Sequence, residues 1–453
     1  MSANPARAAA LRVLGRVRRS GAWVASALDA DPSVGRLEPR DRAFVTALTR
    51  GVVSHAGTLD AFIDEAASRP SAIEPRVRDA LRLAAYEILY LATPSRAAVN
   101  EGVNLVRSIQ PRAASLSNAV LRRISERAQT APFGDTETSL EALALATGHP
   151  AWMAHLLAED LGEQRAREFM SADETQAPLY LAHNPFSAVS YEELLSELAA
   201  QGCEPAHGPV EGSLVCGDAA RTVTSPALKE GRAIVCDLCA QAIVAAVPII
   251  SGSVVFESAA GRGTKTLLLQ AAAVRAGGAA RIVAGDVHGF KVDLLTARMH
   301  HLGVPGVTGV AVDSCDDQAV LALTQGRPDV VFVDAPCSGL GTMRRHPEKR
   351  WSLSAEDIVA LASISEELLG AALRLVRPGG FVVYSTCTVT RRENAQVVEG
   401  AVRAASGTYE MVSLAGRIAP ELSEWVTGEG YFQSLPREGG PDGHFAALVA
   451  RVS

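Results

Sequence analysis

The stretch VVFESAAGRGTKTLLLQ (residues 254–270) decides the fold of the C-terminal half of this 453-residue chain. Its first five residues predict a buried strand, because they begin with the β-branched and aromatic side chains of Val254, Val255 and Phe256. Gly261 and Gly263 follow one residue apart, and the next segment predicts a helix over 264–275. Such glycines let the backbone approach a ligand, and the helix start offers unpaired N–H groups. This order predicts the first unit of an α/β sheet.

The same alternation continues to the end of the chain. Predicted strands are 281–286, 307–313, 329–334, 380–386 and 445–452, and predicted helices are 290–302, 317–325, 355–376 and 393–405. Strands of nearly continuous Val, Ile and Phe that alternate with helices indicate a parallel sheet covered on both faces, a doubly wound domain. Ligands of such domains bind beyond the carboxyl ends of the strands.

Polar residues cluster at those predicted strand ends: Glu257, Asp286, Asp313, Asp334 and Cys387. Asp286 can accept hydrogen bonds from both hydroxyls of a ribose, and Asp313 can accept one from an adenine amino group. Carboxylates at these places disfavour a phosphorylated cofactor and suit a cationic sulfonium. Each aspartate alone is equally well explained as a helix N-cap, but three in consecutive units make that explanation weak. The glycine turn itself lacks the Walker spacing of phosphate-binding loops.

Two cysteine motifs carry the strongest signal. The stretch DAPCSGLGT (residues 334–342) and the stretch STCT (residues 385–388) each place a cysteine directly after a predicted buried strand. A thiol at such a place is reachable, and its pKa can be lowered. A thiolate added to carbon 6 of cytosine makes carbon 5 nucleophilic, so a hard methylation becomes two easier steps. Asp334 is placed to assist at N3 of the base. Packing of buried cysteines is the competing interpretation.

The N-terminal third differs in charge from the rest of the chain. Residues 1–130 hold 19 Arg, no Lys and 12 acidic residues, so their charge is +7 although the whole chain carries −7. Apolar residues recur there at helical spacing and prolines mark the breaks, which predicts an all-helical domain. Arginine suits bidentate contact with phosphate. The alternative is that these arginines only solvate helix surfaces.

The middle of the chain is less informative. A polar run over 131–139 predicts a linker, and 140–245 predicts a small α+β insert with a strand at 179–183 and a helix at 191–201. Cys236 and Cys239 form a lone C-x-x-C, which favours buried thiols over a metal site because no second pair accompanies it. Seven cysteines, an odd and sparse number, favour a reducing cytoplasm, and no apolar run is long enough to span a membrane.

At the two cysteine motifs the sequence resembles the RNA (cytosine-5) methyltransferases of the Fmu/Sun/Nop2 family, and within it the bacterial branch that acts on small-subunit ribosomal RNA. That branch has an N-terminal domain similar to the antitermination factor NusB. The resemblance extends over nearly the whole chain and includes the C-terminal segments QSLP (433–436) and DGHF (442–445).

The resemblance implies a NusB-like helical domain over 1–130, a linker over 131–139, an RNA-binding insert over 140–245 and a Rossmann-like methyltransferase domain over 246–453. Cys387 would be the nucleophile, Cys337 would assist release by β-elimination, and Asp334 would contact both base and cofactor. S-adenosylmethionine would be held by Ala259, Ala260, Gly261, Arg262, Gly263, Thr264, Lys265, Asp286, Asp313 and Asp334. The implied partner is 16S ribosomal RNA, with no metal, no membrane and a monomeric enzyme.

One motif departs from the family pattern. The first motif of the family usually reads C-A-A-P-G-G-K-T, whereas this chain has AAGRGTKT over 259–266, where the cysteine and the proline are replaced and the lysine keeps its place. A positive Arg262 near a cationic cofactor is unexpected unless it points to solvent or RNA. Two other functions stay open at this point: the same chemistry on transfer RNA, and a non-catalytic RNA-binding or antitermination factor, for which a pair of thiols has no use.

Overall fold

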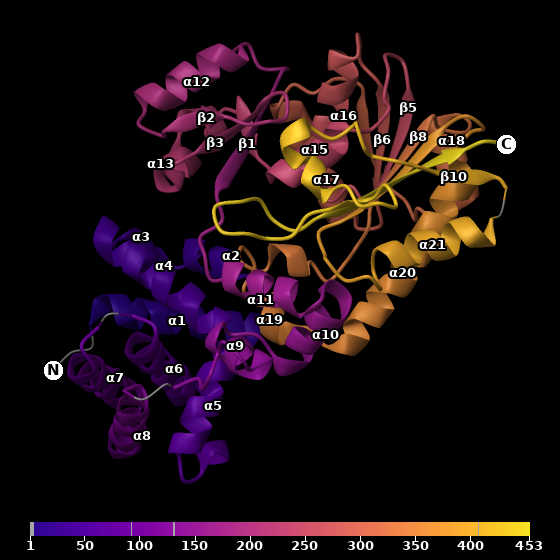
Figure 1. Ribbon diagram of the computed structural model, residues 1–453. Helices are drawn as coiled ribbons and strands as arrows, with labels where there is room; N and C mark the ends of the chain where they lie inside the picture. Colours follow the sequence, from indigo (N-terminus) through magenta and orange to yellow (C-terminus); the bar gives the residue numbers. More distant parts are fainter. Residues whose placement is uncertain (1–3, 92, 130–131, 406) are drawn as a thin grey trace. The chain divides into compact units, whose positions relative to one another are not determined.

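The computed structural model describes residues 4–91, 93–129, 132–405 and 407–453. The chain folds into two compact units (Figure 1). Unit 1 comprises residues 1–174 together with 343–353, and unit 2 comprises 175–342 and 354–453. These divisions do not coincide with the domain boundaries predicted at 130, 140 and 245, which stay a prediction. The first 35 residues of the predicted insert pack with the N-terminal helices.

Unit 1 is helical, as predicted. Its helices are α1 (Pro5–Ser20), α2 (Val24–Asp29), α3 (Pro32–Gly35), α4 (Pro39–Ser54), α5 (Ala56–Ala66), α6 (Pro75–Leu89), α7 (Ser95–Ile109), α8 (Ala114–Arg127), α9 (Leu140–Ala146), α10 (Ala151–Leu161), α11 (Glu163–Ala172) and α19 (Lys349–Ser352). Four of them begin with proline, which has no N–H to leave unsatisfied at a helix start. Buried leucines and isoleucines of α4 to α6 form the centre of its core.

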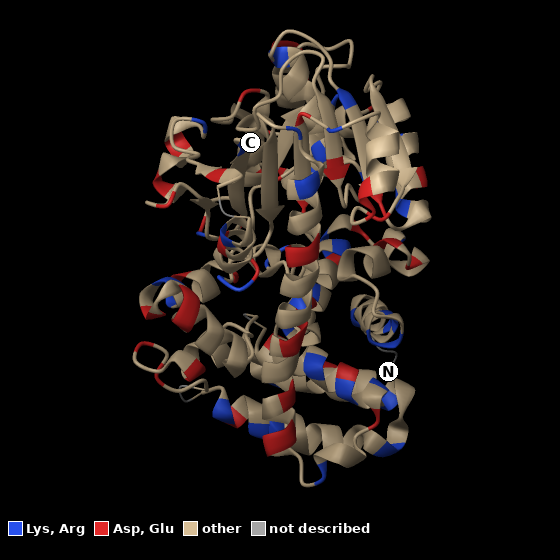
Figure 2. Cartoon of the chain, turned by 90° about the vertical axis from the view of Figure 1, so that its right-hand side faces the viewer, with Lys and Arg blue, Asp and Glu red and all other residues tan. Residues whose placement is uncertain are grey.

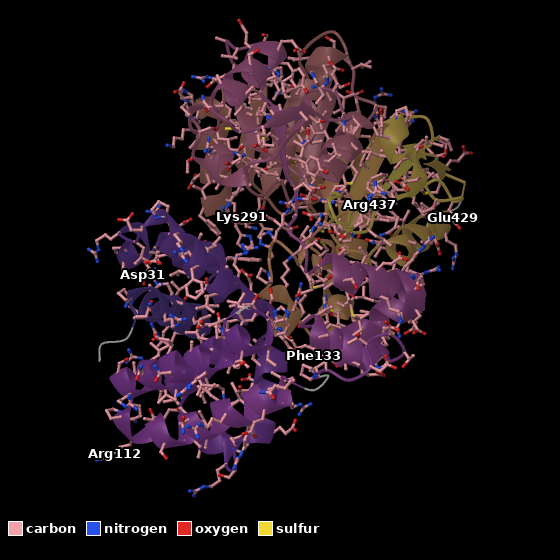
Figure 3. All side chains as sticks on the ribbon, turned by 60° about the vertical axis from the view of Figure 1, so that its left-hand side comes forward. Asp31, Arg112, Phe133, Lys291, Glu429 and Arg437 are labelled. Carbon is pink, nitrogen blue, oxygen red and sulfur yellow. The ribbon has the colours of Figure 1, made fainter. Side chains whose placement is uncertain are left out.

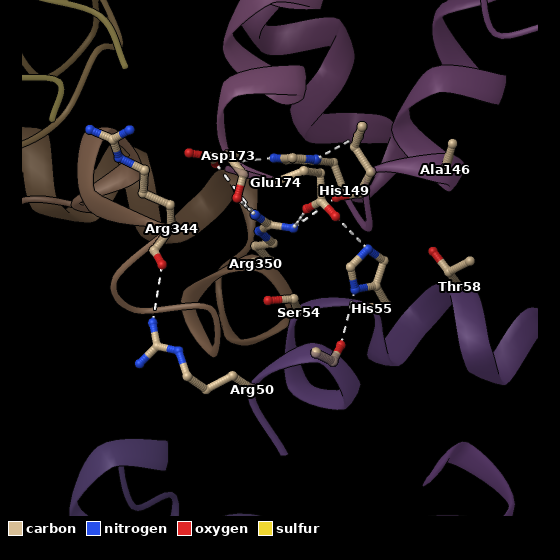
Figure 4. Close-up of polar contacts among 12 residues, drawn as sticks. Arg50, Ser54, His55, Thr58, Ala146, His149, Asp173, Glu174, Arg344 and Arg350 are labelled. Atoms are coloured by element: carbon tan, nitrogen blue, oxygen red, sulfur yellow. Dashed lines mark hydrogen bonds and ion pairs between the residues drawn. The ribbon is translucent and has the colours of Figure 1, made fainter. Parts of the chain in front are cut away.

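The segment 343–353 is held in unit 1 by a buried ionic cluster (Figure 4). Arg350 is 1% exposed and donates to Thr147 O at 2.7 Å, Glu174 Oε1 at 3.0 Å and Asp173 O at 3.0 Å. Burial raises the pKa of Glu174, but His55 and Arg350 more than reverse this effect and lower the pKa to about 2. Trp351 adds a hydrogen bond from its indole N–H to Ser54 O.

Unit 2 contains two sheets. The smaller one joins β1 (Leu179–His183), β2 (Pro205–His207), β3 (Ser213–Cys216) and β4 (Ala233–Val235) in the antiparallel order β2-β3-β1-β4. Helices α12 (Tyr191–Ala200), α13 (Ala219–Thr224) and α14 (Pro226–Lys229) accompany it, and α15 (Leu238–Ala245) leads to the larger sheet. The predicted strand and helix of this region are confirmed. The other strands are three or four residues long, too short to give a periodic signal.

The larger sheet has the order β10-β12-β9-β8-β5-β6-β7, with β11 paired to β12. Its strands are β5 (Val254–Ser258), β6 (Arg281–Asp286), β7 (Val307–Ala311), β8 (Val330–Asp334), β9 (Phe381–Thr386), β10 (Tyr409–Val412), β11 (Phe432–Gln433) and β12 (Phe445–Arg451). The five strands from β5 to β9 are parallel. Strand β12 is antiparallel to both β9 and β10, so β10 runs in the same direction as the parallel strands. The prediction of a parallel sheet is therefore corrected at β12, which the chain reaches from β10 without a crossover α-helix.

Helices cover both faces of the larger sheet, as predicted. They are α16 (Thr264–Arg275), α17 (Gly289–His301), α18 (Asp317–Thr324), α20 (Ala355–Leu375) and α21 (Ala395–Ala404), with α16 and α17 on the face opposite α20 and α21 (Figure 1). Helix α21 begins two residues later than expected, because Glu393 and Asn394 turn their side chains to neighbouring loops. Within the described residues, no helix is long and apolar enough to cross a membrane.

Candidate active site at the carboxyl ends of strands β5, β8 and β9

The order of the strands creates the site. From β5 the chain proceeds outward through β6 and β7, then returns to the other side of β5 as β8 and continues to β9. This reversal is a topological switch point, the usual place of a ligand crevice in open α/β sheets. Strands β8 and β9 are parallel with Asp334 opposite Ser385. Consequently the loops that carry Cys337 and Cys387 leave the sheet at the same edge.

The two thiols predicted to react lie next to each other. The Sγ atoms of Cys337 and Cys387 are 3.5 Å apart, and the backbone N–H of Cys387 donates to Cys337 Sγ at 3.4 Å. Both residues are only partly buried. Gly341 fixes the two loops to each other through its N–H, which donates to Cys387 O at 3.1 Å. The geometry allows both sulfurs to contact one bound molecule.

An ion pair lies at the end of β8. Lys265 Nζ is 2.7 Å from Asp334 Oδ2, so the lysine of the glycine turn and the aspartate of the first cysteine motif act as one unit. Burial lowers the pKa of Lys265, but the charge and hydrogen bond of Asp334 outweigh burial, and the net shift is upward. The lysine therefore carries its proton at neutral pH. Sequence reasoning had placed both residues in the site but did not predict their pairing.

Glu257 is fully buried beneath this pair. Burial raises the pKa of its carboxyl to about 8, against the opposing hydrogen bond from Thr266. Thr266 Oγ1 donates to Glu257 Oε2 at 2.5 Å, whereas Oε1 is buried with no hydrogen-bond partner in the described part of the chain. At neutral pH this carboxyl is therefore mostly protonated and is not a fixed negative charge in the site.

The glycine turn between β5 and α16 has an unusual backbone. Ala259, Gly261 and Gly263 all have positive φ angles, of 57°, 58° and 78°. A Cβ atom on Gly263 would lie 3.0 Å from the side chains of both Leu295 and Met299, which explains why glycine stands there. The alternating positive angles turn the chain sharply, so that Thr264 starts α16 directly beyond the strand end.

Asp286 ends β6 beside this turn. Its Oδ2 accepts the N–H of Gly261 at 3.2 Å, and Lys291 Nζ, whose residue is labelled in Figure 3, is 3.5 Å from the same oxygen. The next residue, Val287, has 69% of its surface exposed. A carboxylate followed by an exposed apolar side chain fits a nucleoside, because the ribose can hydrogen-bond to one and the base can pack on the other.

The two remaining cofactor candidates are exposed. Asp313 lies two residues beyond the end of β7, where its Oδ1 accepts the N–H of Cys315 at 2.9 Å. Arg262 points outward at the tip of the glycine turn, as its charge requires next to a cationic ligand. The residues from 259 to 265, with Asp286 and Val287, fit S-adenosylmethionine, and the buried orphan oxygen of Glu257 lies in the same strand end.

Sequence reasoning missed Glu393 and Asn394, which hold the cysteine loops. Glu393 is fully buried and its carboxylate accepts hydrogen bonds from Ser338, Thr388 and Thr390. Asn394 accepts from Thr386 Oγ1 at 2.6 Å and donates to Thr388 O at 3.0 Å. The stretch RREN (391–394) follows the second cysteine motif, but an acidic residue at this place also suits a helix start, so its role in holding the loops was not predictable.

The C-x-x-C pair has no free thiolate, although Cys236 lies close enough to Lys265 and Asp334 for their charges to act on its thiol. Cys236 and Cys239 are buried, as predicted, and burial raises the pKa of the Cys236 thiol to about 12. Among the described residues, no group of three or more His, Cys, Asp or Glu side chains is arranged to hold a metal ion. These two thiols therefore stay protonated and pack as small apolar side chains.

Unit 1 contains a basic groove of about 500 Å³ between α1, α6 and α7. Arg16, Arg19 and Arg76 line it, are exposed and form no ion pair with the described residues. Some arginines of this unit are neutralised, for example Arg18 by Asp79 at 2.9 Å. Figure 2 shows basic and acidic residues side by side along these helices. The groove gathers three arginines whose positive charge stays available for an anionic partner.

Comparisons with known proteins agree with this arrangement. Residues 248–450 match the family model described as 16S rRNA methyltransferase RsmB/F, and residues 4–126 match the NusB family model. A Mycobacterium tuberculosis protein named as a methyltransferase is 32% identical, with 99% of this chain and 97% of that protein aligned. Ribosomal RNA small subunit methyltransferase B of Xanthomonas campestris is 30% identical, with 99% and 97% aligned. The solved structure of PH0851 covers both chains completely, with a TM-score of 0.80 and 23% identity.

Proposed function

Because the chain belongs to the RsmB/F family of 16S rRNA methyltransferases and therefore uses S-adenosylmethionine, we propose that it forms 5-methylcytosine in 16S ribosomal RNA through a covalent enzyme–cytosine adduct. The observation that carries the proposal is the distance of 3.5 Å between the sulfurs of Cys337 and Cys387 at one edge of the sheet. A binding protein needs no thiol pair, whereas a covalent mechanism needs one group to add and another to promote elimination.

Cys387 is the proposed nucleophile. Its thiolate forms a bond to carbon 6 of the cytosine, and the electrons of the carbon 5–carbon 6 double bond shift to carbon 5. When bound, S-adenosylmethionine would supply an electrophilic methyl group to carbon 5, with its sulfur–methyl bond broken and S-adenosylhomocysteine as the leaving group. Cys337 removes the remaining proton from carbon 5, after which the double bond forms again and the bond from carbon 6 to Cys387 breaks. The close approach of the two sulfurs supports this division, because both must reach adjacent carbons of one ring.

The pair formed by Lys265 and Asp334 is proposed to hydrogen-bond to the base. Addition of the thiolate places negative charge on N3 and on the exocyclic groups, which a positioned proton donor stabilises. Since the pKa of Lys265 is raised, its ammonium keeps a proton in the pair that can be donated in a hydrogen bond to the base. The role at N3 of the base that the sequence predicts for Asp334 is therefore proposed for the ion pair as a whole. Ala259–Lys265, Asp286 and Asp313 are proposed to hold the cofactor.

The basic groove of unit 1 is the proposed contact for the RNA backbone. Phosphates favour guanidinium groups that are not already neutralised, and Arg16, Arg19 and Arg76 meet this condition. The role of the predicted insert in RNA binding and the monomeric state stay predictions.

The decisive experiment is methylation in vitro. The purified protein is incubated with S-adenosylmethionine carrying a labelled methyl group and with protein-free 16S rRNA, and the RNA is digested to nucleosides for mass spectrometry. Label in 5-methylcytidine from the wild-type protein, and none from Cys387→Ala, is the expected result. Label in another nucleoside would overturn the cytosine assignment, and label in transfer RNA but not in 16S rRNA would overturn the substrate.

A further inference from the structure

A single buried carboxylate joins the two cysteine loops. Glu393 Oε1 accepts the backbone N–H of Ser338 at 2.6 Å, and Oε2 accepts the Ser338 hydroxyl at 2.7 Å. The same Oε2 accepts the hydroxyls of Thr390 at 2.8 Å and Thr388 at 3.2 Å. Ser338 directly follows Cys337, and Thr388 directly follows Cys387. One side chain thus contacts both residues that follow the thiols.

These contacts involve both oxygens of the carboxyl. One donor group lies at Oε1 and three lie at Oε2. The hydroxyls of Ser338 and Thr388 are also 2.7 Å apart, so one of them donates to the other and the two loops share one hydrogen-bond network with Glu393. Its side chain is completely buried, and it forms no ion pair with any basic residue in the part of the chain that the structure describes. Glu393 is therefore not part of a salt bridge that happens to lie nearby. Among the described residues, the hydrogen-bond partners of its carboxyl are Ser338, Thr388 and Thr390, which belong to the two cysteine loops.

The backbone of Glu393 and the two loops are held by further hydrogen bonds. The hydroxyl of Tyr384, on β9, donates to the backbone oxygen of Glu393. Asn394 binds the Cys387 loop on both sides of the thiol, through Thr386 and Thr388. On the other loop, Ser365 of α20 donates to Pro336 O at 3.3 Å. The sulfur of each cysteine is thus held through groups that precede and follow it in sequence.

From these contacts we infer that Glu393 is a positioning residue that sets the separation of the Cys337 and Cys387 thiols. It touches neither sulfur in the structure and does not act on substrate. Its importance for methyl transfer rests on the proposed function, but its effect on the distance between the thiols does not. Small displacements of reacting groups have large kinetic effects, since an error of about 1 Å can cost about 100-fold in rate.

The thiol separation can be measured without RNA or cofactor. Phenylarsine oxide condenses with two neighbouring thiols, forming two As–S bonds and releasing one water, with arsenic remaining trivalent. The full-length wild-type protein is expected to bind one more equivalent of phenylarsine oxide than Cys337→Ala. A monothiol should not remove this additional equivalent, whereas a dithiol should. The Cys337→Ala protein subtracts any binding at the other cysteines.

Glu393→Ala and the isosteric Glu393→Gln are expected to lower the affinity for this additional equivalent of phenylarsine oxide at least tenfold. Glu393→Gln places an amide N–H₂ group against the donors of the two cysteine loops. It therefore removes hydrogen bonds that connect these loops, with little change in side-chain volume. Thr390→Val is the matched control, because it removes one donor to the same carboxylate but leaves both contacts next to the cysteines. It is expected to bind the arsenical like the wild type. Circular dichroism confirms that each variant is folded.

The same variants then give a kinetic result. Glu393→Gln should lower kcat about 100-fold and leave the KM for RNA within threefold. If Glu393→Gln binds the arsenical as tightly as the wild type, the inference is wrong, whatever its activity. If arsenical binding weakens while Cys387→Ala still methylates RNA, the proposed covalent mechanism fails and the positioning inference stands. If Glu393→Gln loses its folded spectrum while Thr390→Val keeps it, the carboxylate supports the whole domain, which overturns a local role.

Discussion

Lys265 Nζ lies 2.7 Å from Asp334 Oδ2, and this contact joins the helix after β5 to the end of β8 across the switch point of the sheet. The side chain of Lys265 is 16% exposed and that of Asp334 is 32% exposed, so water screens the pair only in part. Because the pair connects the cofactor turn with the first cysteine loop, a change at either residue should affect both binding surfaces.

Asp334→Asn is expected to lower the free energy of unfolding by about 2 kcal/mol, less than for a fully buried pair because of the partial exposure. It leaves the Lys265 ammonium in a site where burial opposes its charge. Lys265→Met/Asp334→Asn should regain most of this stability because no uncompensated charge remains, but methyl transfer should stay lost in both. Chemical denaturation and a methylation assay measure the two properties, and recovery of activity in the double variant would refute the role of the pair.

Substitution of the two cysteines should cause two different defects. Cys387→Ala is expected to abolish methyl transfer and leave RNA affinity nearly unchanged, because no bond to carbon 6 can form. Cys337→Ala is expected to stall after methylation as a covalent protein–RNA adduct, seen as a slowly migrating band on a denaturing gel. Normal turnover of Cys337→Ala without such a band would remove its proposed part in release.

Glu257 makes stability depend on pH. Burial raises its pKa in the folded protein to about 8 from the ordinary value of 4.5, so the folded chain holds a proton that the unfolded chain has lost between these pH values. The contribution of Glu257 to the free energy of unfolding is complete below pH 4.5 and is lost as pH rises through 8. Glu257→Gln, which cannot ionise, should gain stability over the wild type by at most about 1.4 kcal/mol per pH unit in this window. Melting temperatures of both proteins without cofactor, at pH 5 to 8.5, test this, and parallel curves would contradict it.

Arg350→Met is expected to destabilise unit 1 by about 3 kcal/mol, because it removes the donor to the backbone oxygens of the buried residues Thr147 and Asp173 and the cation beside the partly exposed Glu174. The pKa of Glu174 is lowered to about 2 in the folded protein, so its stabilising effect is present above pH 4.5 and is lost as pH falls through 2. The variant and the wild type should therefore differ more at pH 7 than at pH 3. Lys349→Met is the matched control, since it removes a neighbouring cation without buried acceptors, and an equal loss in both would argue against the cluster.

Substituting Ala for Arg16, Arg19 and Arg76 together should weaken RNA binding and reduce the slope of log affinity against log salt by about 2, or about 0.7 for each lost phosphate contact with single-stranded RNA. The control substitutes Arg69, Arg112 and Arg122, which are also exposed and form no ion pair with the described residues but lie outside the groove. Fluorescence anisotropy at several salt concentrations gives both slopes. Equal slopes for the two triple variants would assign the binding to overall charge.

Local patterns in the sequence were sufficient for the large elements and for the identity of the site. Strands such as Val254–Ser258 and helices such as Thr264–Arg275 have the predicted bounds, because each is long, apolar and closed by a glycine or a charged residue. The cysteines were recognisable because each follows a buried strand. The short strands of the insert and β10 were not predictable, because two to four residues have no readable period.

Contacts between distant residues could not be predicted in the same way. The pairing of Lys265 with Asp334 and of Glu393 with Ser338 depends on the order of strands in the sheet, which a single sequence does not state. The elevated pKa of Glu257 depends on complete burial, and an acidic residue at a strand end gives no sign of whether water reaches it. The membership of 343–353 in unit 1 was hidden because its charged residues, RRHPEKR, look like an exposed loop.

That membership has a consequence for how the protein is made. Translation proceeds from the N-terminus, so the ribosome has finished residues 1–174 long before it reaches Arg350. Until then Asp173, Glu174 and the backbone of Thr147 lack the guanidinium that satisfies them in the finished protein. By the time Arg350 is synthesised, strands β5 to β8 already exist. The contacts of Arg350 in unit 1 therefore form only after half of the strands of the larger sheet have been translated, and neither unit is encoded as one uninterrupted stretch.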